Sequence, residues 1–137
     1  MILSLDTNVF IDLLRGRNQA VRAGFNAARM EAVEFRLSLI VWHELMYGVR
    51  RSPRPERALQ SVRAVTADIP VEAFVEDDMM AAAEIRARLK STGQPIGPYD
   101  ALIAGQALAR GWAVVTANRG EFGRVPGLTV IDWTEAA

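Results

Sequence analysis

The chain alternates short apolar runs with longer segments whose apolar residues recur every three or four positions, and this alternation most constrains its fold. Apolar runs of about four to eight residues bounded by polar or breaker residues are typical of buried strands, whereas the longer period is typical of helices. A repeated strand–helix–strand order predicts parallel strands joined by right-handed crossovers. We therefore expect an α/β fold, a three-layer α/β/α sandwich around a mainly parallel central sheet.

The predicted elements cover most of the sequence. Strands are predicted over residues 2–5, 35–40, 69–71, 112–116 and 128–132, and helices over 9–15, 20–33, 42–51, 55–62, 77–90 and 98–110, with a loop over 118–127. Pro98 and Gly111 support the bounds of the last helix, because proline favours the first helical position and glycine the position after the end. No repeat or linker-like tract divides the 137 residues, a length that suits one core. The sequence predicts a single domain over residues 1–137.

The composition excludes several kinds of chemistry. The sequence contains no cysteine, so thiolate nucleophiles, disulfides and cysteine zinc sites are ruled out. His43 is the only histidine, which excludes multi-histidine metal sites. No apolar run approaches the roughly 18 residues of a membrane span, and the first residues read as a strand rather than a signal segment. We expect a cytoplasmic protein without a membrane partner.

The charge balance gives no sign of a generic nucleic-acid binder. The sequence has 16 acidic and 16 basic residues, so the positive excess typical of such proteins is missing. All the bases except Lys90 are arginine, which suits bidentate phosphate recognition but is equally well explained by genomic base composition. A basic run at Arg50, Arg51, Arg54 and Arg57 is interpreted first as a solvated surface and second as a phosphate contact.

Acidic residues recur where predicted strands end or where the following helices begin. Asp6 follows the first strand, Glu44 lies early in the helix after the second, and Asp100 lies near the start of the last predicted helix. Glu121 lies in the loop after the strand that follows. In open α/β sheets ligands bind beyond the carboxyl ends of the strands, so we expect these acids to converge there. Each acid alone is more often a helix cap, although the apolar helix around Glu44 would leave an unpaired charge poorly solvated.

Three or four converging carboxylates predict a divalent cation. Their mutual repulsion must be offset, and hard cations such as Mg²⁺ or Mn²⁺ accept oxygen ligands of this kind. Such an ion can lower the pKa of a bound water and stabilise charge on the leaving oxygen during phosphodiester cleavage. This chemistry needs no protein nucleophile, which agrees with a chain that lacks cysteine and has a single histidine.

Four motifs resemble those of a known family. They are L-D-T-N-V-F at 5–10, S-L-I-V-W-H-E-L-M-Y-G at 38–48, D-A-L-I-A at 100–104 and V-T-A-N-R-G-E-F at 115–122. In this order they resemble PIN-domain proteins, specifically the VapC-type toxins of bacterial VapBC toxin–antitoxin pairs, over nearly the whole chain. The resemblance implies a Mg²⁺- or Mn²⁺-dependent endoribonuclease that is inhibited by a VapB-type antitoxin and is commonly a homodimer, alone or within a toxin–antitoxin hetero-oligomer.

The resemblance also assigns residues. Asp6, Glu44 and Asp100 match the family's three central acids, and Glu121 is assigned as the fourth catalytic and metal-binding acid, because many relatives carry Asp where this chain has Asn118. Supporting positions are Thr7, Asn8, Thr116 and Asn118, and Arg119 and Arg124 flank Glu121 as candidate RNA contacts. Val41 departs from the pattern, since relatives often carry a threonine there that can cap the helix bearing Glu44.

Two other functions stay open. A haloacid-dehalogenase-like phosphatase would also have an aspartate after its first strand, at the position of Asp6. It would require a second aspartate at the position of Asn8 and a suitably placed lysine, whereas Lys90 is the only lysine. A non-catalytic binding module would use the acid cluster to receive an arginine of a partner. Apolar residues at 42, 46, 47, 79 and 80 are interpreted as ordinary core, with an antitoxin groove or dimer contact as the alternative. The motifs leave open whether transfer, ribosomal or messenger RNA is the substrate.

Overall fold

A computed structural model describes residues 1–135 as a five-stranded sheet with the order β3-β2-β1-β4-β5. The strands are β1 (Ile2–Leu5), β2 (Glu34–Ser38), β3 (Val71–Glu72), β4 (Ala113–Val115) and β5 (Val130–Ile131). All four neighbouring pairs are parallel. Residues 136 and 137, the last two of the predicted domain, lie outside the described part of the chain.

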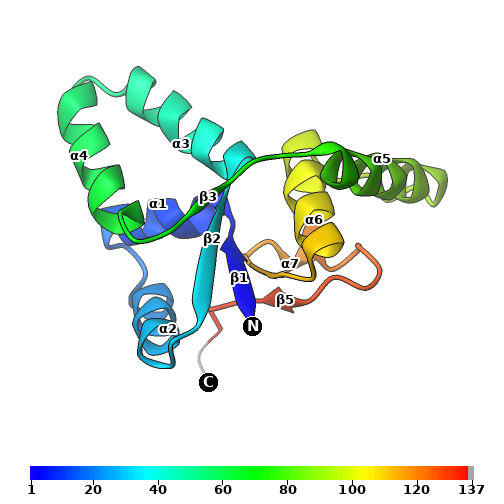
Figure 1. Ribbon diagram of the computed structural model, residues 1–137, viewed down its shortest axis with the longest axis horizontal. Coiled ribbons are helices and arrows are strands. Elements are labelled where there is room, and N and C mark those ends of the chain that lie inside the picture. The colour runs from blue at the N-terminus through cyan, green and yellow to red at the C-terminus, as the bar shows by residue number, and fades with distance from the viewer. Residues whose placement is uncertain (136–137) are drawn as a thin grey trace.

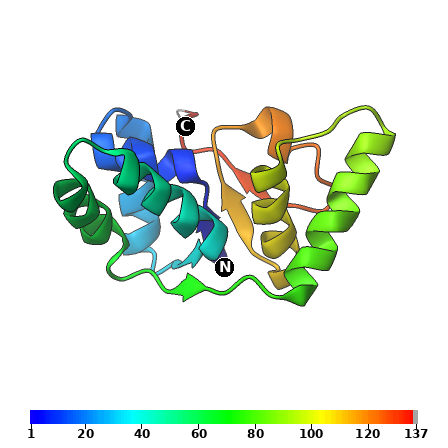
Figure 2. The same cartoon turned by 90° about the horizontal axis from the view of Figure 1, so that it is seen from above.

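Helices cover both faces of the sheet (Figures 1 and 2). One face carries α1 (Thr7–Arg15), α2 (Gln19–Met30), α3 (Leu39–Arg51) and α4 (Pro55–Thr66), and the other carries α5 (Glu76–Ser91), α6 (Pro98–Arg110) and the short α7 (Arg119–Phe122). Strand order explains this division. The chain runs outward from β1 through β2 to β3 and then returns to β4 on the far side of β1, so right-handed crossovers put the later helices on the opposite face. The predicted three-layer parallel fold is confirmed.

The core is densest around the two central strands. Leu5 of β1 and Val114 and Val115 of β4 are fully buried, because helices cover both faces of these strands. On one face, α5 packs tightly against α6: a Cβ built on Gly105 would lie 2.7 Å from the Cβ of Ala82. This close approach holds α5 against α6, and a side chain at position 105 would prevent it.

Helix starts differ from the sequence prediction at two places that matter for the site. α1 begins at residue 7 rather than 9, because Asp6 itself is the N-cap and accepts a hydrogen bond from Thr7 N. α3 begins at residue 39 rather than 42, because Ser38 caps it by accepting from Ile40 N. The expectation that Val41 removes a helix cap is therefore wrong: Val41 lies inside the helix and is fully buried.

The predicted loop over 118–127 also contains an element that the sequence pattern did not indicate. A single helical turn, α7, begins after Asn118, whose side-chain oxygen accepts from Glu121 N at 3.4 Å. No helix within residues 1–135 has the length and apolar character that crossing a bilayer requires.

Candidate active site

The order of the strands reverses between β1 and β4, and crevices beyond the carboxyl ends of strands at such a switch point are where open α/β sheets bind ligands. Asp6 directly follows β1, and its backbone N–H donates to Val115 O of β4 at 2.9 Å. Thr116 directly follows β4, and its backbone N–H donates to Ile131 O at 2.9 Å. The sheet therefore sets these two side chains next to each other at this crevice.

Asp6 is held by donors on both carboxylate oxygens. Its Oδ1 accepts from Thr7 N at 2.7 Å, and its Oδ2 accepts from the hydroxyl of Thr116 at 2.9 Å. The residue is only 4% exposed. Burial raises the pKa of Asp6 above its usual value, the two donors act in the opposite direction, and the charges of Glu44 and Glu121 raise it further. The Asp6 carboxylate is thus fixed in one orientation and would be stabilised by a positive partner.

Glu44 reaches the same crevice from the second turn of α3. Thr7 Oγ1 donates to Glu44 Oε1 at 2.8 Å, so the residue after Asp6 orients a second acid. The early start of α3, capped by Ser38, sets how far along the helix Glu44 lies. Glu44 is half-buried, and its charge acts on both Asp6 and Asp100.

Asp100 and Glu121 complete the cluster from the other face of the sheet. Asp100 lies in the first turn of α6, and Glu121 lies on α7, where it accepts from Gly97 N at 3.3 Å and from Asn118 Nδ2 at 2.9 Å. Burial raises the pKa of Asp100 to about 8, together with its hydrogen bond to Glu121 and the charges of Asp6, Glu121 and Glu44. The same hydrogen bond lowers the pKa of Glu121. A raised pKa of this size means that Asp100 keeps its proton below about pH 8 in the absence of a cation and can donate it to the Glu121 carboxylate.

The four acids share one electrostatic environment without forming a closed set of ligands. Within residues 1–135, no three acid, histidine or cysteine side chains are arranged around a common point as a ready metal site. Each glutamate is instead turned toward its own donors, Thr7 for Glu44 and Gly97 and Asn118 for Glu121. Like charges at short range repel unless a cation or a shared proton offsets the repulsion, and Asp100 and Glu121 share such a proton. A donor set made only of oxygens fits a hard divalent cation rather than a soft metal.

None of the four acids forms an ion pair with an arginine or lysine in the described residues. Arg119 pairs instead with Asp132 at 3.8 Å and Glu135 at 3.6 Å. Arg124 donates to Pro95 O at 3.0 Å, and its charge lowers the pKa of Glu121, so its guanidinium lies at the rim of the cluster.

The supporting residues differ in what they contact. Thr7 and Thr116 are buried and each donates to an acid of the cluster, whereas Asn8 is exposed and makes no side-chain hydrogen bond within residues 1–135. Asn118 caps α7 and donates to Glu121. Gly97 was not predicted from the sequence, although glycine before Pro98 at the start of a helix carrying Asp100 marks it as the residue at the helix cap.

Two aromatic residues are sequence neighbours of the acids. The rings of His43, next to Glu44, and Tyr99, next to Asp100, have centroids 6.0 Å apart.

The interpretation of residues 42, 46, 47, 79 and 80 as core holds for Trp42 and Met46, which pack against the core. It is wrong for Tyr47, Met79 and Met80, whose exposed fractions are 58%, 42% and 58%.

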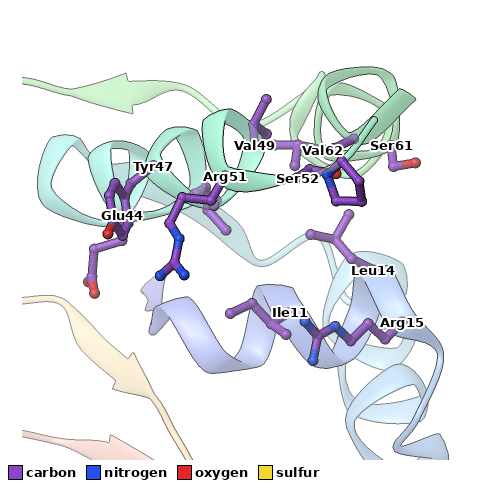
Figure 3. Close-up of a pocket in the computed structure, with 14 residues that line it drawn as sticks. Ile11, Leu14, Arg15, Glu44, Tyr47, Val49, Arg51, Ser52, Ser61 and Val62 are labelled. Carbon is purple, nitrogen blue, oxygen red and sulfur yellow. The ribbon is translucent and has the colours of Figure 1, made fainter. Parts of the chain in front are cut away.

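A groove of about 510 Å³ runs from Glu44 between α1, α3 and α4. Figure 3 shows Ile11 and Leu14 pointing from α1 across the gap, and the guanidinium group of Arg51 pointing back toward α1. Leu45, Val49 and Val62 add further apolar wall. The groove is therefore lined mainly by apolar side chains, and Glu44 of the acid cluster and the cations Arg15 and Arg51 also line it.

A parallel α/β sheet with a carboxylate cluster at its switch point defines an α/β domain with a candidate cation site, and comparison with known proteins identifies the family. The family model described as PIN domain matches residues 3–128. The chain is 37% identical over 129 residues to a tRNA(fMet)-specific endonuclease VapC of Salmonella typhimurium, covering 94% of this chain and 96% of that protein. The chain belongs to the PIN-domain family and, within it, to the VapC ribonucleases.

Solved structures agree with this assignment. The DNA-bound VapBC complex from Salmonella typhimurium contains a chain that matches with a TM-score of 0.87 at 36% identity, covering 97% of this chain and 98% of that one. VapBC2 from Rickettsia felis, bound to a DNA fragment of its promoter, matches with a TM-score of 0.89 at 28% identity, covering 97% and 99%. The likeness spans the whole described sheet and its helices.

Proposed function

We propose that this protein is an endoribonuclease toxin that cleaves RNA with a divalent cation, Mg²⁺ or Mn²⁺, held by Asp6, Glu44, Asp100 and Glu121. The observation that carries the proposal is the convergence of these acids from four segments at the switch point, none of them paired with an arginine or lysine in residues 1–135. Structural carboxylates are normally neutralised by such pairs. A cluster of acids that lacks such ion pairs can bind an external cation.

The residues of the chain have distinct tasks in this proposal. Asp6, Glu44, Asp100 and Glu121 would hold the cation, which would supply Lewis-acid chemistry: activation of the attacking water and stabilisation of charge on the leaving oxygen. Thr116 and Thr7 hold Asp6 and Glu44 in fixed orientations. Asp100 would release to solvent the proton that it shares with Glu121 once a cation is bound, because that proton is retained mainly by burial and by the neighbouring negative charges. Arg124, at the rim, can contact a phosphate of the substrate.

The proposed substrate class is transfer RNA, because the relative that is 37% identical is named a tRNA(fMet)-specific endonuclease. The test is incubation of purified chain with total bacterial RNA, followed by mapping of the new RNA ends. We expect internal cuts in transfer RNA with Mg²⁺ or Mn²⁺ and none with a chelator. Inactivity on all cellular RNA with either ion would overturn the proposal. An activity on transfer RNA also implies that the protein acts in the cytoplasm.

We further propose two protein partners. A VapB-type antitoxin is expected to fill the apolar groove beside Glu44, since the matching structures are VapBC complexes. A second copy of the chain is expected against exposed Val71, Val75, Met79 and Met80, which lie on β3 and near the start of α5. Light scattering of the purified chain alone tests the second copy, and the same measurement after co-expression with a VapB-type protein tests the antitoxin.

The hydroxyl of Thr116 should matter for metal binding. Thr116→Val keeps the shape of this fully buried residue but removes the donor to Asp6 Oδ2. We expect metal affinity or activity to fall by about tenfold, the lower end of what such orienting partners contribute. Isothermal titration with Mn²⁺ measures it, and Thr116→Ser, which keeps the hydroxyl, should bind metal like the original chain. Equal affinity of the valine and serine variants would contradict the role.

Asp100 should destabilise the metal-free protein at neutral and higher pH. Because its pKa is raised to about 8 in the folded state, the folded protein binds the proton more tightly than the unfolded one, and this contribution to stability is lost as pH rises toward about 8. Asp100→Asn should therefore raise the unfolding free energy at pH 8 by about 1 kcal/mol, a value discounted because the carboxyl is only partly buried.

The pH dependence of thermal unfolding checks this effect. The advantage of Asp100→Asn should shrink steadily as the pH is lowered from about 8 and should vanish only below about pH 3, where the carboxyl is protonated in both the folded and the unfolded state. Saturating Mn²⁺ should reverse the order, because ligand binding stabilises only the chain that keeps its ligands. A difference that stays constant from pH 4 to pH 8 would contradict the prediction.

A further inference from the structure

A second cavity, of about 310 Å³, lies between α5 and the segment that connects α5 to α6. It is lined by Ala83, Arg86, Ala87, Lys90, Pro95 and Ile96. The four residues from α5 follow the spacing that puts side chains on one face of a helix. No acidic residue lines the cavity, so it combines two cations with a small apolar floor.

The two cations are free to bind a ligand. Arg86 and Lys90 are exposed, and neither forms an ion pair within residues 1–135. The helix that carries them is nevertheless held in place, because the other face of α5 is buried through Ala82, Ile85 and Leu89 and packs against α6 at Gly105. A rigid helix thus presents both charges to the same cavity.

The cavity adjoins the acid cluster through the backbone of residues 95–97. Pro95 O accepts from Arg124 Nη1 at 3.0 Å, and Gly97 N donates to Glu121 Oε1 at 3.3 Å. In Figure 2 the connection from the end of α5 to the start of α6 passes beside α7, which carries Glu121. Three cations, Arg86, Lys90 and Arg124, therefore surround a segment that also orients one of the four acids.

We propose that this cavity is an RNA subsite, in which Arg86 and Lys90 bind a backbone phosphate of a nucleotide adjacent to the cleaved bond. The inference rests on the proposed ribonuclease function and extends it to the position of the substrate strand. An acid cluster repels RNA, and the chain has no net positive charge, so local cations outside the cluster must supply the attraction. The apolar floor of alanine, proline and isoleucine side chains suits the face of a sugar or base.

The test compares matched charge removals on one helix. Arg86→Gln alone and together with Lys90→Gln probe the cavity, and Arg88→Gln is the control, because Arg88 lies on the same helix but lines a different cavity with Glu84 and Pro126. Binding of end-labelled bulk bacterial transfer RNA is measured in a chelator over a series of salt concentrations. Chelation makes the result independent of cleavage. Lys90→Arg keeps the charge and should bind like the original chain.

We expect the double variant to bind transfer RNA on the order of tenfold more weakly and to lower the salt slope by about 0.7 per lost phosphate contact. Arg88→Gln should stay within about twofold. With Mn²⁺ present, KM should rise in the double variant while kcat holds. Equal effects of Arg86→Gln and Arg88→Gln, or no RNA binding by the original chain, would overturn the proposal. The proposal would also be overturned if the double variant bound transfer RNA like the original chain and lost only binding to an acidic protein. Inactivity of a chain that still binds RNA through these residues would instead overturn the ribonuclease assignment alone.

Discussion

Replacing Asp6 by asparagine is expected to lower RNA cleavage on the order of 10³-fold while the fold survives. Asp6 is buried, its carboxylate is oriented by Thr7 and Thr116, and it adjoins Glu44 and Glu121. Asparagine keeps an oxygen that can cap α1 but removes the negative charge that would hold a cation. A loss of this size corresponds to about 4 kcal/mol of transition-state stabilisation. Single-turnover cleavage of transfer RNA with Mn²⁺ measures it.

The matched control is Glu31→Gln, which removes an exposed carboxylate at the end of α2. This variant should cleave at the original rate, so a general effect of lost negative charge is separated from loss of the cluster. Thermal unfolding of both variants checks that the fold is intact. Undiminished cleavage by Asp6→Asn would contradict the assignment of Asp6 as a metal ligand, and metal binding unchanged by it would favour a non-catalytic module.

The parallel sheet could be predicted from the sequence because its determinants are local. β1 has the predicted bounds, Ile2–Leu5, and α6 has the predicted bounds, Pro98–Arg110, where proline and glycine mark the two ends. The convergence of Asp6, Glu44 and Asp100 followed from a general property of α/β sheets, since parallel strands bring their carboxyl ends to one edge. Their roles as metal ligands stay a prediction, as does the single domain over 1–137.

The contacts that orient the acids could not be predicted in the same way. Thr116 and Asp6 are far apart in sequence and meet only because β1 and β4 are neighbours. The single turn of α7 is too short to produce a periodic pattern, and its cap, Asn118, read as a loop residue. The sequence also could not predict the unpaired cations of the cavity beside α5, because tertiary packing determines whether Arg86 or Lys90 has an acidic partner.

Arg110→Met is expected to lower the free energy of unfolding by about 3–5 kcal/mol, although the residue touches none of the proposed metal ligands. Arg110 binds both oxygens of Asp78, at 3.1 and 2.9 Å, and also donates to Glu72 and Ala73 O. Asp78 is fully buried and caps α5 by accepting from Val75 N. Removing the guanidinium leaves a buried carboxylate without its cation. Urea unfolding measures the loss.

Arg29 provides a matched control for this ion pair. Like Arg110, it pairs with an aspartate, Asp68 at 3.0 Å, and lies over an aromatic ring, but both partners are largely exposed. Arg29→Met should therefore cost less than about 1 kcal/mol. Adding Asp78→Asn to Arg110→Met should recover part of the lost stability, because the amide keeps an acceptor for the cap without a buried charge. If the Arg110 and Arg29 variants lost similar stability, the burial of Asp78 would not explain the strength of the ion pair between Asp78 of α5 and Arg110 of α6.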